Sequence, residues 1–158
     1  MDTKTAIKQL KLLQKDVKGM RLAAEEWKEE WQILISIIMS ARTRDETTIK
    51  VAEKLFAVYM TPVALAAANP AGVYALIRPV NFSRNKTKSV IGCAKGLVER
   101  FGSTPPHDCD LLISLPGVGR KTANVFLSEV GKDAIGVDTH VSYISQKLGW
   151  TKHQNPHK

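Results

Sequence analysis

The sequence predicts an all-α protein, and three observations support that fold class. Apolar residues recur at helical spacing along most of the chain, and no segment alternates with period two. Two helix starts are marked by a capping residue followed by proline. A Pro-Gly-Val-Gly turn separates two short apolar segments near the C-terminal third. With 158 residues, 44% of them hydrophobic, the chain suits one domain or two small lobes, and wholesale disorder is excluded.

The first half of the chain predicts three helices. The first carries an apolar stripe made of Ile7, Leu10, Leu13 and Val17. The second is apolar on several sides, as a central core helix is, with Trp31, Leu34, Ile35 and Ile38 as its markers. The third is capped by Asp45 and carries Ile49, Ala52, Phe56 and Tyr59.

The next helices begin at recognisable signals. Thr61-Pro62 and Asn69-Pro70 each place a capping residue before a proline at the first helical position. A longer helix begins at Ser83 and ends at Gly102, which is suited to the left-handed conformation of a helix stop. Its inward face is formed by Val90, Ala94, Leu97, Val98 and Phe101.

Charge and cysteine content restrict the function. The net charge of +8 favours a polyanionic partner, of which nucleic acid is the commonest, although a generic basic protein is the alternative. The only cysteines are Cys93, expected to be a buried core thiol, and Cys109, so the chain has no four-cysteine cluster. The N-terminus lacks a signal peptide, and the longest apolar run, residues 33–39, is too short to span a bilayer. We therefore expect an intracellular protein of the cytoplasm or nucleoid, without a membrane partner.

The segment from Asp110 to Gly131 predicts a helix-hairpin-helix, over residues 111–131. A short apolar helix, 111–115, precedes Pro116-Gly117-Val118-Gly119, and a second helix begins near Arg120. Glycines permit the tight turn and let backbone N–H groups approach a ligand. The positive end of the second helix then favours phosphate, which is bound without sequence readout. The predicted DNA-contacting residues of the hairpin are Gly117, Val118, Gly119 and Arg120.

Two ionisable residues suggest chemistry. Lys121 lies in the first turn of the second hairpin helix, where a cation is disfavoured, and this repulsion favours the neutral, nucleophilic amine. The alternative is that Lys121 contacts phosphate, as Arg120 is expected to do. Asp138 precedes a helix that begins near Thr139, so it is expected to be an N-cap, a role compatible with catalysis.

The segment LPGVGRKTAN, followed by VDTH at residues 137–140, resembles the signature of the endonuclease III family of helix-hairpin-helix (HhH-GPD) DNA glycosylases. The resemblance extends from about Trp31 to Trp150. It implies a six-helix barrel-like domain, residues 27–136, together with an incomplete second lobe formed by residues 1–26 and 137–158. The spacing of Lys121 and Asp138 also fits the family.

The resemblance implies a bifunctional DNA glycosylase and abasic-site lyase of base excision repair, acting on duplex DNA with damaged or abasic sites. Lys121 matches the family's catalytic lysine, which forms a Schiff base with the sugar. Asp138 matches the aspartate that helps activate the nucleophile and stabilises positive charge on the sugar. Asp45 matches an acidic residue near the base pocket, and a role only as a helix cap is its alternative. His140 is assigned to the same pocket and is expected to be structural rather than catalytic.

The resemblance also assigns residues to the DNA face. Arg42 stands where bacterial relatives carry a glutamine that fills the gap left by the flipped base; an orphaned base, a phosphate or plain solvent are its alternative partners. Phe82 occupies the position of an apolar wedge, and a core phenylalanine is the alternative. Arg84, Lys86 and Lys88 are expected to contact backbone phosphates.

The chain departs from the family in several ways. It is C-terminally short and lacks the cysteines of the family's [4Fe–4S] cluster, so we expect no cluster and no metal cofactor, with a monovalent cation at the hairpin left open. The stripe of the first helix is then expected to lack the later helices against which it packs in the family. Three explanations stay open: the sequence is a fragment, another chain covers that face, or the lobe is poorly ordered. Tyr143 replaces a residue that is often basic in relatives. Oxidised pyrimidines are the expected lesions; the competing hypotheses are a preference for mismatched or alkylated bases, and a non-catalytic DNA-binding hairpin module. Oligomeric state is not indicated.

Overall fold

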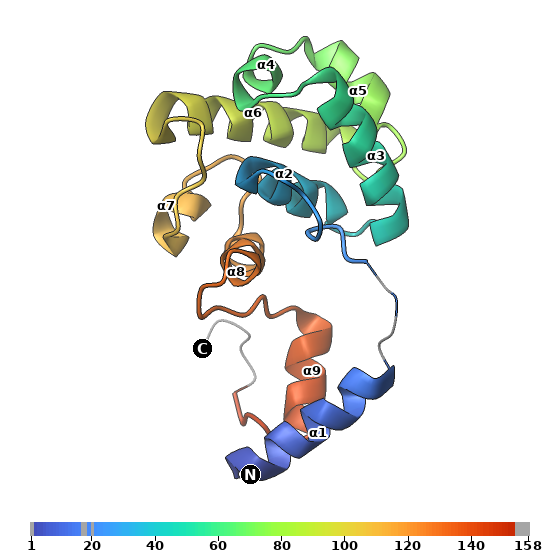
Figure 1. The fold of residues 1–158 in the computed structure, drawn as a ribbon, viewed down its shortest axis with the longest axis vertical. Coiled ribbons are helices and arrows are strands. Elements are labelled where there is room, and N and C mark those ends of the chain that lie inside the picture. Colours follow the sequence, from blue (N-terminus) through green and yellow to red (C-terminus); the bar gives the residue numbers. More distant parts are fainter. Residues whose placement is uncertain (1, 17–18, 20, 154–158) are drawn as a thin grey trace. The chain divides into compact units, whose positions relative to one another are not determined.

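A computed structural model describes residues 2–16, 19 and 21–153, and the all-α prediction is confirmed, because this part of the chain contains helices and no strand (Figure 1). The helices are α1 (Thr3–Asp16), α2 (Glu30–Ser40), α3 (Asp45–Val58), α4 (Pro62–Ala66), α5 (Pro70–Ile77), α6 (Ser83–Phe101), α7 (Cys109–Ile113), α8 (Arg120–Glu129) and α9 (Thr139–Lys147).

The chain divides into two compact units. The central unit is residues 22–136 and holds α2 to α8, while the terminal unit is residues 1–21 together with 137–158 and holds α1 and α9. The sequence analysis placed its boundaries after residues 26 and 136. The assignment of these segments to domains stays a prediction.

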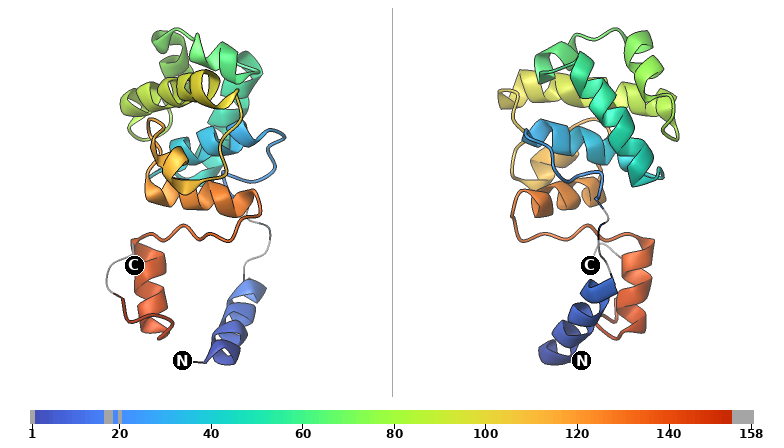
Figure 2. Two further views of the ribbon diagram at one scale, coloured as in Figure 1. Left: turned by 90° about the vertical axis from the view of Figure 1, so that its left-hand side faces the viewer. Right: turned by 45° about the vertical axis from the view of Figure 1, so that its right-hand side comes forward.

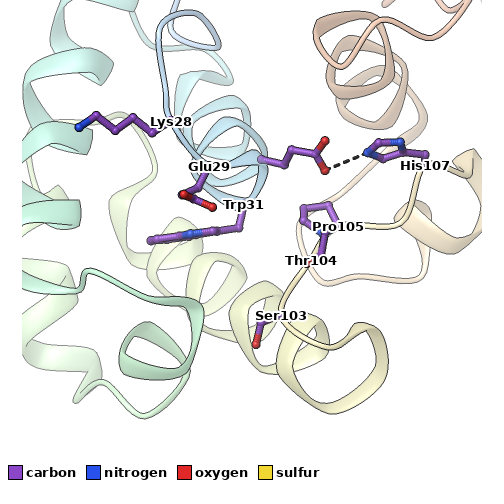
Figure 3. Close-up of a pocket in the computed structure, with 8 residues that line it drawn as sticks. Lys28, Glu29, Trp31, Ser103, Thr104, Pro105 and His107 are labelled. Carbon is purple, nitrogen blue, oxygen red and sulfur yellow. Dashed lines mark hydrogen bonds and ion pairs between the residues drawn. The ribbon is translucent and has the colours of Figure 1, made fainter.

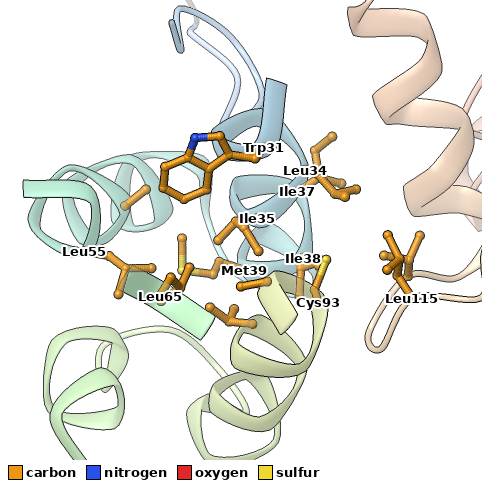
Figure 4. Close-up of a cluster of buried hydrophobic side chains, with 14 of the residues drawn as sticks. Trp31, Leu34, Ile35, Ile37, Ile38, Met39, Leu55, Leu65, Cys93 and Leu115 are labelled. Atoms are coloured by element: carbon orange, nitrogen blue, oxygen red, sulfur yellow. The ribbon is translucent and has the colours of Figure 1, made fainter. Parts of the chain in front are cut away.

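Helix α2 lies at the centre of the central unit and contacts α3, α6 and α8 (Figure 1). This position explains its composition, since a helix surrounded by others is apolar on several faces. Leu34, Ile35 and Met39 have no exposed surface (Figure 4). Trp31 packs edge-on against Phe56 of α3. The prediction of a central core helix is confirmed.

Helices α4 and α5 pack against the long helix α6 (Figures 1 and 2). Both begin as the sequence predicts: the Thr61 hydroxyl accepts from Ala64 N, and the Asn69 side chain accepts from Ala71 N. Helix α6 ends at Gly102, whose φ of 57° is the predicted left-handed stop.

Cys93 of α6 is fully buried, as predicted for a core thiol. Burial disfavours the thiolate and raises the pKa of Cys93 to about 12. The thiol therefore packs as a small apolar group and is not a nucleophile.

The terminal unit leaves apolar side chains of α1 exposed to solvent. Trp150 Nε1, which follows α9, donates a hydrogen bond of 2.6 Å to Gln9 Oε1 of α1. Ile7, Leu10 and Leu13 of the predicted stripe are all exposed, and Val17 lies outside the described residues. Within the part of the chain that the structure describes, no helix has the length and apolar character needed to cross a membrane.

Candidate functional site

The predicted hairpin is present, with α7, a turn over residues 114–119, and α8. Helix α7 begins two residues earlier than predicted, because the Asp108 side chain caps it by accepting from Leu111 N. Gly117 has a φ of 79°, and a Cβ built there would lie 2.5 Å from Cβ of Ser89. Gly117 is thus required both by the turn and by the close approach of α6.

Gly119 has a different role, because its φ of −94° suits any residue. A Cβ on Gly119 would meet no described atom within 4 Å, so the chain's own packing does not require a glycine there. Gly119 is the N-cap of α8 and has no side chain with which to cap the helix. The unpaired N–H groups of the first turn, beginning with that of Arg120, therefore lie at the positive end of α8 and face an open surface. An anion-binding site requires this arrangement.

Val118, predicted as a DNA-contacting residue, is only 6% exposed, and its N–H donates to Leu115 O at 3.2 Å. Its side chain belongs to the core, so a DNA contact of Val118 stays a prediction for its backbone alone. Its role is to anchor the turn so that Gly119 and Arg120 stay outside.

Lys121 is the second residue of α8, and its side chain is exposed. Asp138 caps α9 as predicted, with Oδ1 accepting from Val141 N at 2.8 Å. The exposed His140 is the second residue of α9. Lys121 belongs to the central unit, and Asp138 and His140 to the terminal unit, so their cooperation stays a prediction.

Arg42 and Phe82 form a pair of exposed tips on the central unit. Phe82 is 59% exposed, which rules out the alternative of a core phenylalanine. The guanidinium of Arg42 lies 5.6 Å from the centre of the Phe82 ring, within cation–π range. Both residues adopt left-handed backbone conformations, with φ of 54° and 57°, which are strained for residues with a side chain.

Two residues that the sequence analysis did not single out join the loops of Arg42 and Phe82. Asn81 N donates to Thr43 Oγ1 at 3.0 Å, and Asn81 Nδ2 donates to Arg42 O. Nothing in the local sequence indicated this link, because the partners are nearly 40 positions apart.

The basic residues after Phe82 have different environments. Arg84 and Lys88 are exposed, as phosphate contacts must be. Lys86, in contrast, is 7% exposed, and its ammonium donates to Met39 O, Ala41 O and Thr43 Oγ1 at 2.6, 2.6 and 3.0 Å. The expectation that Lys86 contacts a phosphate therefore needs correction, since these internal oxygens occupy its donors.

Asp45 is the first residue of α3, and Arg44 is the N-cap. The predicted cap is thus displaced by one residue, although an acid in the first turn still complements the helix dipole. Its predicted place near a base pocket stays a prediction.

Two hollows are recorded on the central unit. A cavity of about 480 Å³ lies between the start of α2 and the segment after α6, and His107 Nε2 is 2.9 Å from Glu30 Oε2 at its edge (Figure 3). Its lining includes no residue of the predicted site. A shallower hollow of about 370 Å³ adjoins Phe82 and is lined further by Tyr74, Ser83, Arg84 and Asn85.

Among the described residues, no group of three or more His, Cys, Asp or Glu side chains is arranged to hold a metal ion. The resemblance to the endonuclease III family implies a [4Fe–4S] cluster in many relatives. The cysteines of these 158 residues do not fit such a cluster. The chain has two cysteines, one of them buried in α6, whereas such a cluster takes four thiolates.

The fold and the hairpin together define an all-helical protein of the helix-hairpin-helix class. A family model described as "HhH-GPD superfamily base excision DNA repair protein" matches residues 35–158, and the chain belongs to this family.

The chain is similar to several proteins named Endonuclease III. It is 46% identical over 130 residues to that of Thermotoga maritima, covering 81% of this chain and 61% of the relative. It is 41% identical over 127 residues to that of Synechocystis, covering 79% and 58%. The chain thus spans about three fifths of the length of these relatives.

Solved structures agree with the sequence relatives. A non-covalent Endonuclease III–DNA complex is 33% identical with a TM-score of 0.83, covering 98% of this chain and 73% of that one. A trapped Endonuclease III–DNA covalent intermediate matches with the same values. A thermostable thymine-DNA glycosylase, 19% identical with a TM-score of 0.76, shares the fold.

Proposed function

We propose that this chain is a DNA glycosylase and abasic-site lyase of base excision repair, acting on duplex DNA with damaged bases, foremost oxidised pyrimidines, or with abasic sites. One observation carries the proposal: Lys121 is exposed in the first turn of α8, directly after the open Gly119 surface. A primary amine beside a phosphate-binding helix end is suited to attack on a nucleotide sugar.

In this proposal the hairpin binds the DNA backbone, and the exposed pair Arg42 and Phe82 contacts the bases. The N-terminus of α8, with Gly119 and Arg120, holds a backbone phosphate, while Gly117 and Val118 fix the turn. Phe82 enters the base stack as a wedge, and Arg42 fills the space that the flipped nucleotide leaves. Arg84 and Lys88 add phosphate contacts.

In the chemical step, the unprotonated amine of Lys121 attacks the anomeric carbon of the sugar, and the bond to the damaged base breaks with the electron pair leaving on the base. The attacking nitrogen then loses a proton, and the departing base gains one. The sugar ring then opens to a Schiff base on Lys121. Loss of a proton from C2′ breaks the bond between C3′ and its phosphate oxygen, which nicks the strand on the 3′ side. Water releases the amine.

Asp138 stabilises the positive charge that develops on the sugar and helps to activate the amine. Its cap bond to Val141 N fixes the orientation of the carboxylate, so capping and catalysis use the same residue. We propose that Asp45 lies near the pocket for the flipped base and that His140 has a structural role.

The relatives support this proposal. Two solved Endonuclease III structures are DNA complexes, one of them a trapped covalent intermediate, and a chemistry with a covalent step is what Lys121 offers. We propose that these residues act without a metal cofactor, a monovalent cation at the hairpin being the one ion the proposal admits. The protein is expected to work where DNA is, in the cytoplasm or nucleoid.

The test is borohydride trapping on a duplex with one abasic site. Wild-type protein is expected to give a covalent adduct, Lys121→Ala none, and Lys95→Ala, which removes an exposed lysine of α6, a normal adduct. Asp138→Asn is expected to slow trapping while DNA binding is kept. DNA binding without any adduct would overturn the lyase assignment and favour a binding module.

A further inference from the structure

Lys86 occupies an unusual place for a lysine. It lies one turn into α6, its side chain is 7% exposed, and its ammonium has three oxygen acceptors, from Met39, Ala41 and Thr43. An ammonium has three hydrogens, so these acceptors use all of them. Burial of a charge is unfavourable unless such bonds replace water, and a methionine would fill the same volume without this cost.

The three bonds join segments far apart in the sequence. Met39 O and Ala41 O belong to the end of α2, where the last carbonyls have no helical partner and a cation is favourable. Thr43 Oγ1 also accepts from Asn81 N, and Asn81 Nδ2 binds Arg42 O. The network therefore binds the carbonyl of Arg42 and the residues directly before and after it.

The same residue holds Phe82 through its backbone. Lys86 N donates to Phe82 O at 3.0 Å, in the first turn of α6. One residue thus links the carbonyl of Phe82 to the loop that carries Arg42. Both tips have strained, left-handed backbones, which persist only when the surroundings fix them.

We infer that Lys86 is a positioning residue that pre-organises Arg42 and Phe82 as one rigid wedge for unstacking DNA. This inference rests on the proposed function, in which the two tips enter the duplex. Ordering the tips before binding removes the entropy loss that flexible loops would incur on the DNA. Desolvation lowers the pKa of Lys86 to about 8, so near pH 7 the group keeps the three N–H donors that the network uses.

The experiment compares DNA unstacking with chemistry. The 158-residue chain is mixed with a duplex carrying 2-aminopurine opposite a tetrahydrofuran abasic analogue, and the fluorescence rise on binding is measured. Lys86→Met is expected to lose most of that rise. On a true abasic site, its single-turnover borohydride trapping is expected to slow by about 10-fold or more on the duplex. Trapping on a single-stranded abasic oligonucleotide, which needs no wedge, should stay within about 2-fold.

Matched variants separate positioning from stability. Leu97→Ala weakens the core of the same helix away from the tips, so it is expected to change duplex and single-strand trapping equally. Thr43→Val removes the shared acceptor and should reproduce Lys86→Met, whereas Thr43→Ser keeps the hydroxyl and should behave as wild type. If Lys86→Met does not fold, the comparison of Thr43→Val with Thr43→Ser tests the positioning role instead.

The outcomes are distinct. A normal fluorescence rise with Lys86→Met and Thr43→Val would overturn the positioning role. So would a trapping rate that falls equally on the duplex and the single strand, as expected for Leu97→Ala. A wild-type chain that unstacks DNA but forms no adduct would overturn the lyase assignment alone, and the fluorescence comparison would still decide on Lys86. A wild-type chain that does not unstack DNA would overturn the inference as well.

Discussion

The two glycines of the hairpin turn are expected to respond in opposite ways to the same change. Gly117→Ala places a Cβ at a backbone with φ of 79° and 2.5 Å from Ser89 Cβ. The left-handed conformation costs about 1–2 kcal/mol, and forcing α6 and the turn apart costs about 1–3 kcal/mol. A total near 3 kcal/mol would lower Tm by roughly 10 °C.

Gly119→Ala adds the same methyl group where the described chain leaves open space. Its effect on stability is expected to be no more than about 1 kcal/mol, the difference between glycine and the poorer N-cap alanine. On DNA, however, the methyl group stands between the α8 N-terminus and a phosphate. Loss of one hydrogen bond to a charged group, about 1.5–3 kcal/mol, corresponds to roughly 10- to 150-fold in Kd.

The assays are thermal unfolding and fluorescence anisotropy with an abasic duplex at one fixed salt concentration, because phosphate binding depends strongly on salt. Gly117→Ala should unfold early, and Gly119→Ala should unfold normally but bind weakly. Normal binding by Gly119→Ala would refute the assignment of the open surface to phosphate. An unchanged Tm for Gly117→Ala would refute the packing argument.

Three further results are expected. Phe82→Ala should leave the free energy of unfolding within about 0.5 kcal/mol of wild type, because the ring is exposed, yet lose the 2-aminopurine signal; a full signal would exclude the wedge. Cys93 should resist a thiol reagent at pH 8 in folded protein while the half-buried Cys109 reacts, and both should react after denaturation; two thiols titrating equally fast in native protein would contradict the core assignment. Partial burial, then the Glu25 carboxylate, raise the pKa of Glu129. The folded state therefore binds its proton more tightly than the unfolded state, so stability falls as pH rises above about 4.5. Glu129→Gln should raise Tm slightly at pH 7 and not at pH 4; an equal gain at both would contradict this cause.

Features set by neighbouring residues were predictable from the sequence. The caps at Thr61 and Asn69, the stop at Gly102 and the cap at Asp138 each depend on a side chain or backbone within five residues. The periodicity of α2 likewise predicted a core helix. The sequence predicted Asp45 as the cap of α3, whereas the structure has Arg44 there. The end residue of a helix is thus harder to predict than the presence of the helix.

Features set by distant residues were not predictable. Lys86 looked like one more basic residue of a DNA-facing segment, but its acceptors lie 43 to 47 positions earlier. Phe82 was equally consistent with a core residue or a wedge until the structure showed its exposure. The turn motif suggested that both glycines permit a tight turn without a Cβ clash. Of the two, only Gly117 needs to lack a Cβ, because Ser89 of α6 lies against it, whereas a Cβ on Gly119 would meet no described atom within 4 Å.

The left-handed backbones of Arg42 and Phe82 imply that thermal stability and the proposed DNA unstacking favour different residues at these positions. Glycine at position 82 would relieve the backbone strain of a φ of 57° and remove an exposed aromatic ring, and glycine at position 42 would relieve the corresponding strain. Selection for thermal stability alone would therefore favour glycine at positions 42 and 82 and would remove the side chains of the proposed DNA wedge. Phenylalanine and arginine at such positions are what selection for repair, rather than for durability, is expected to retain.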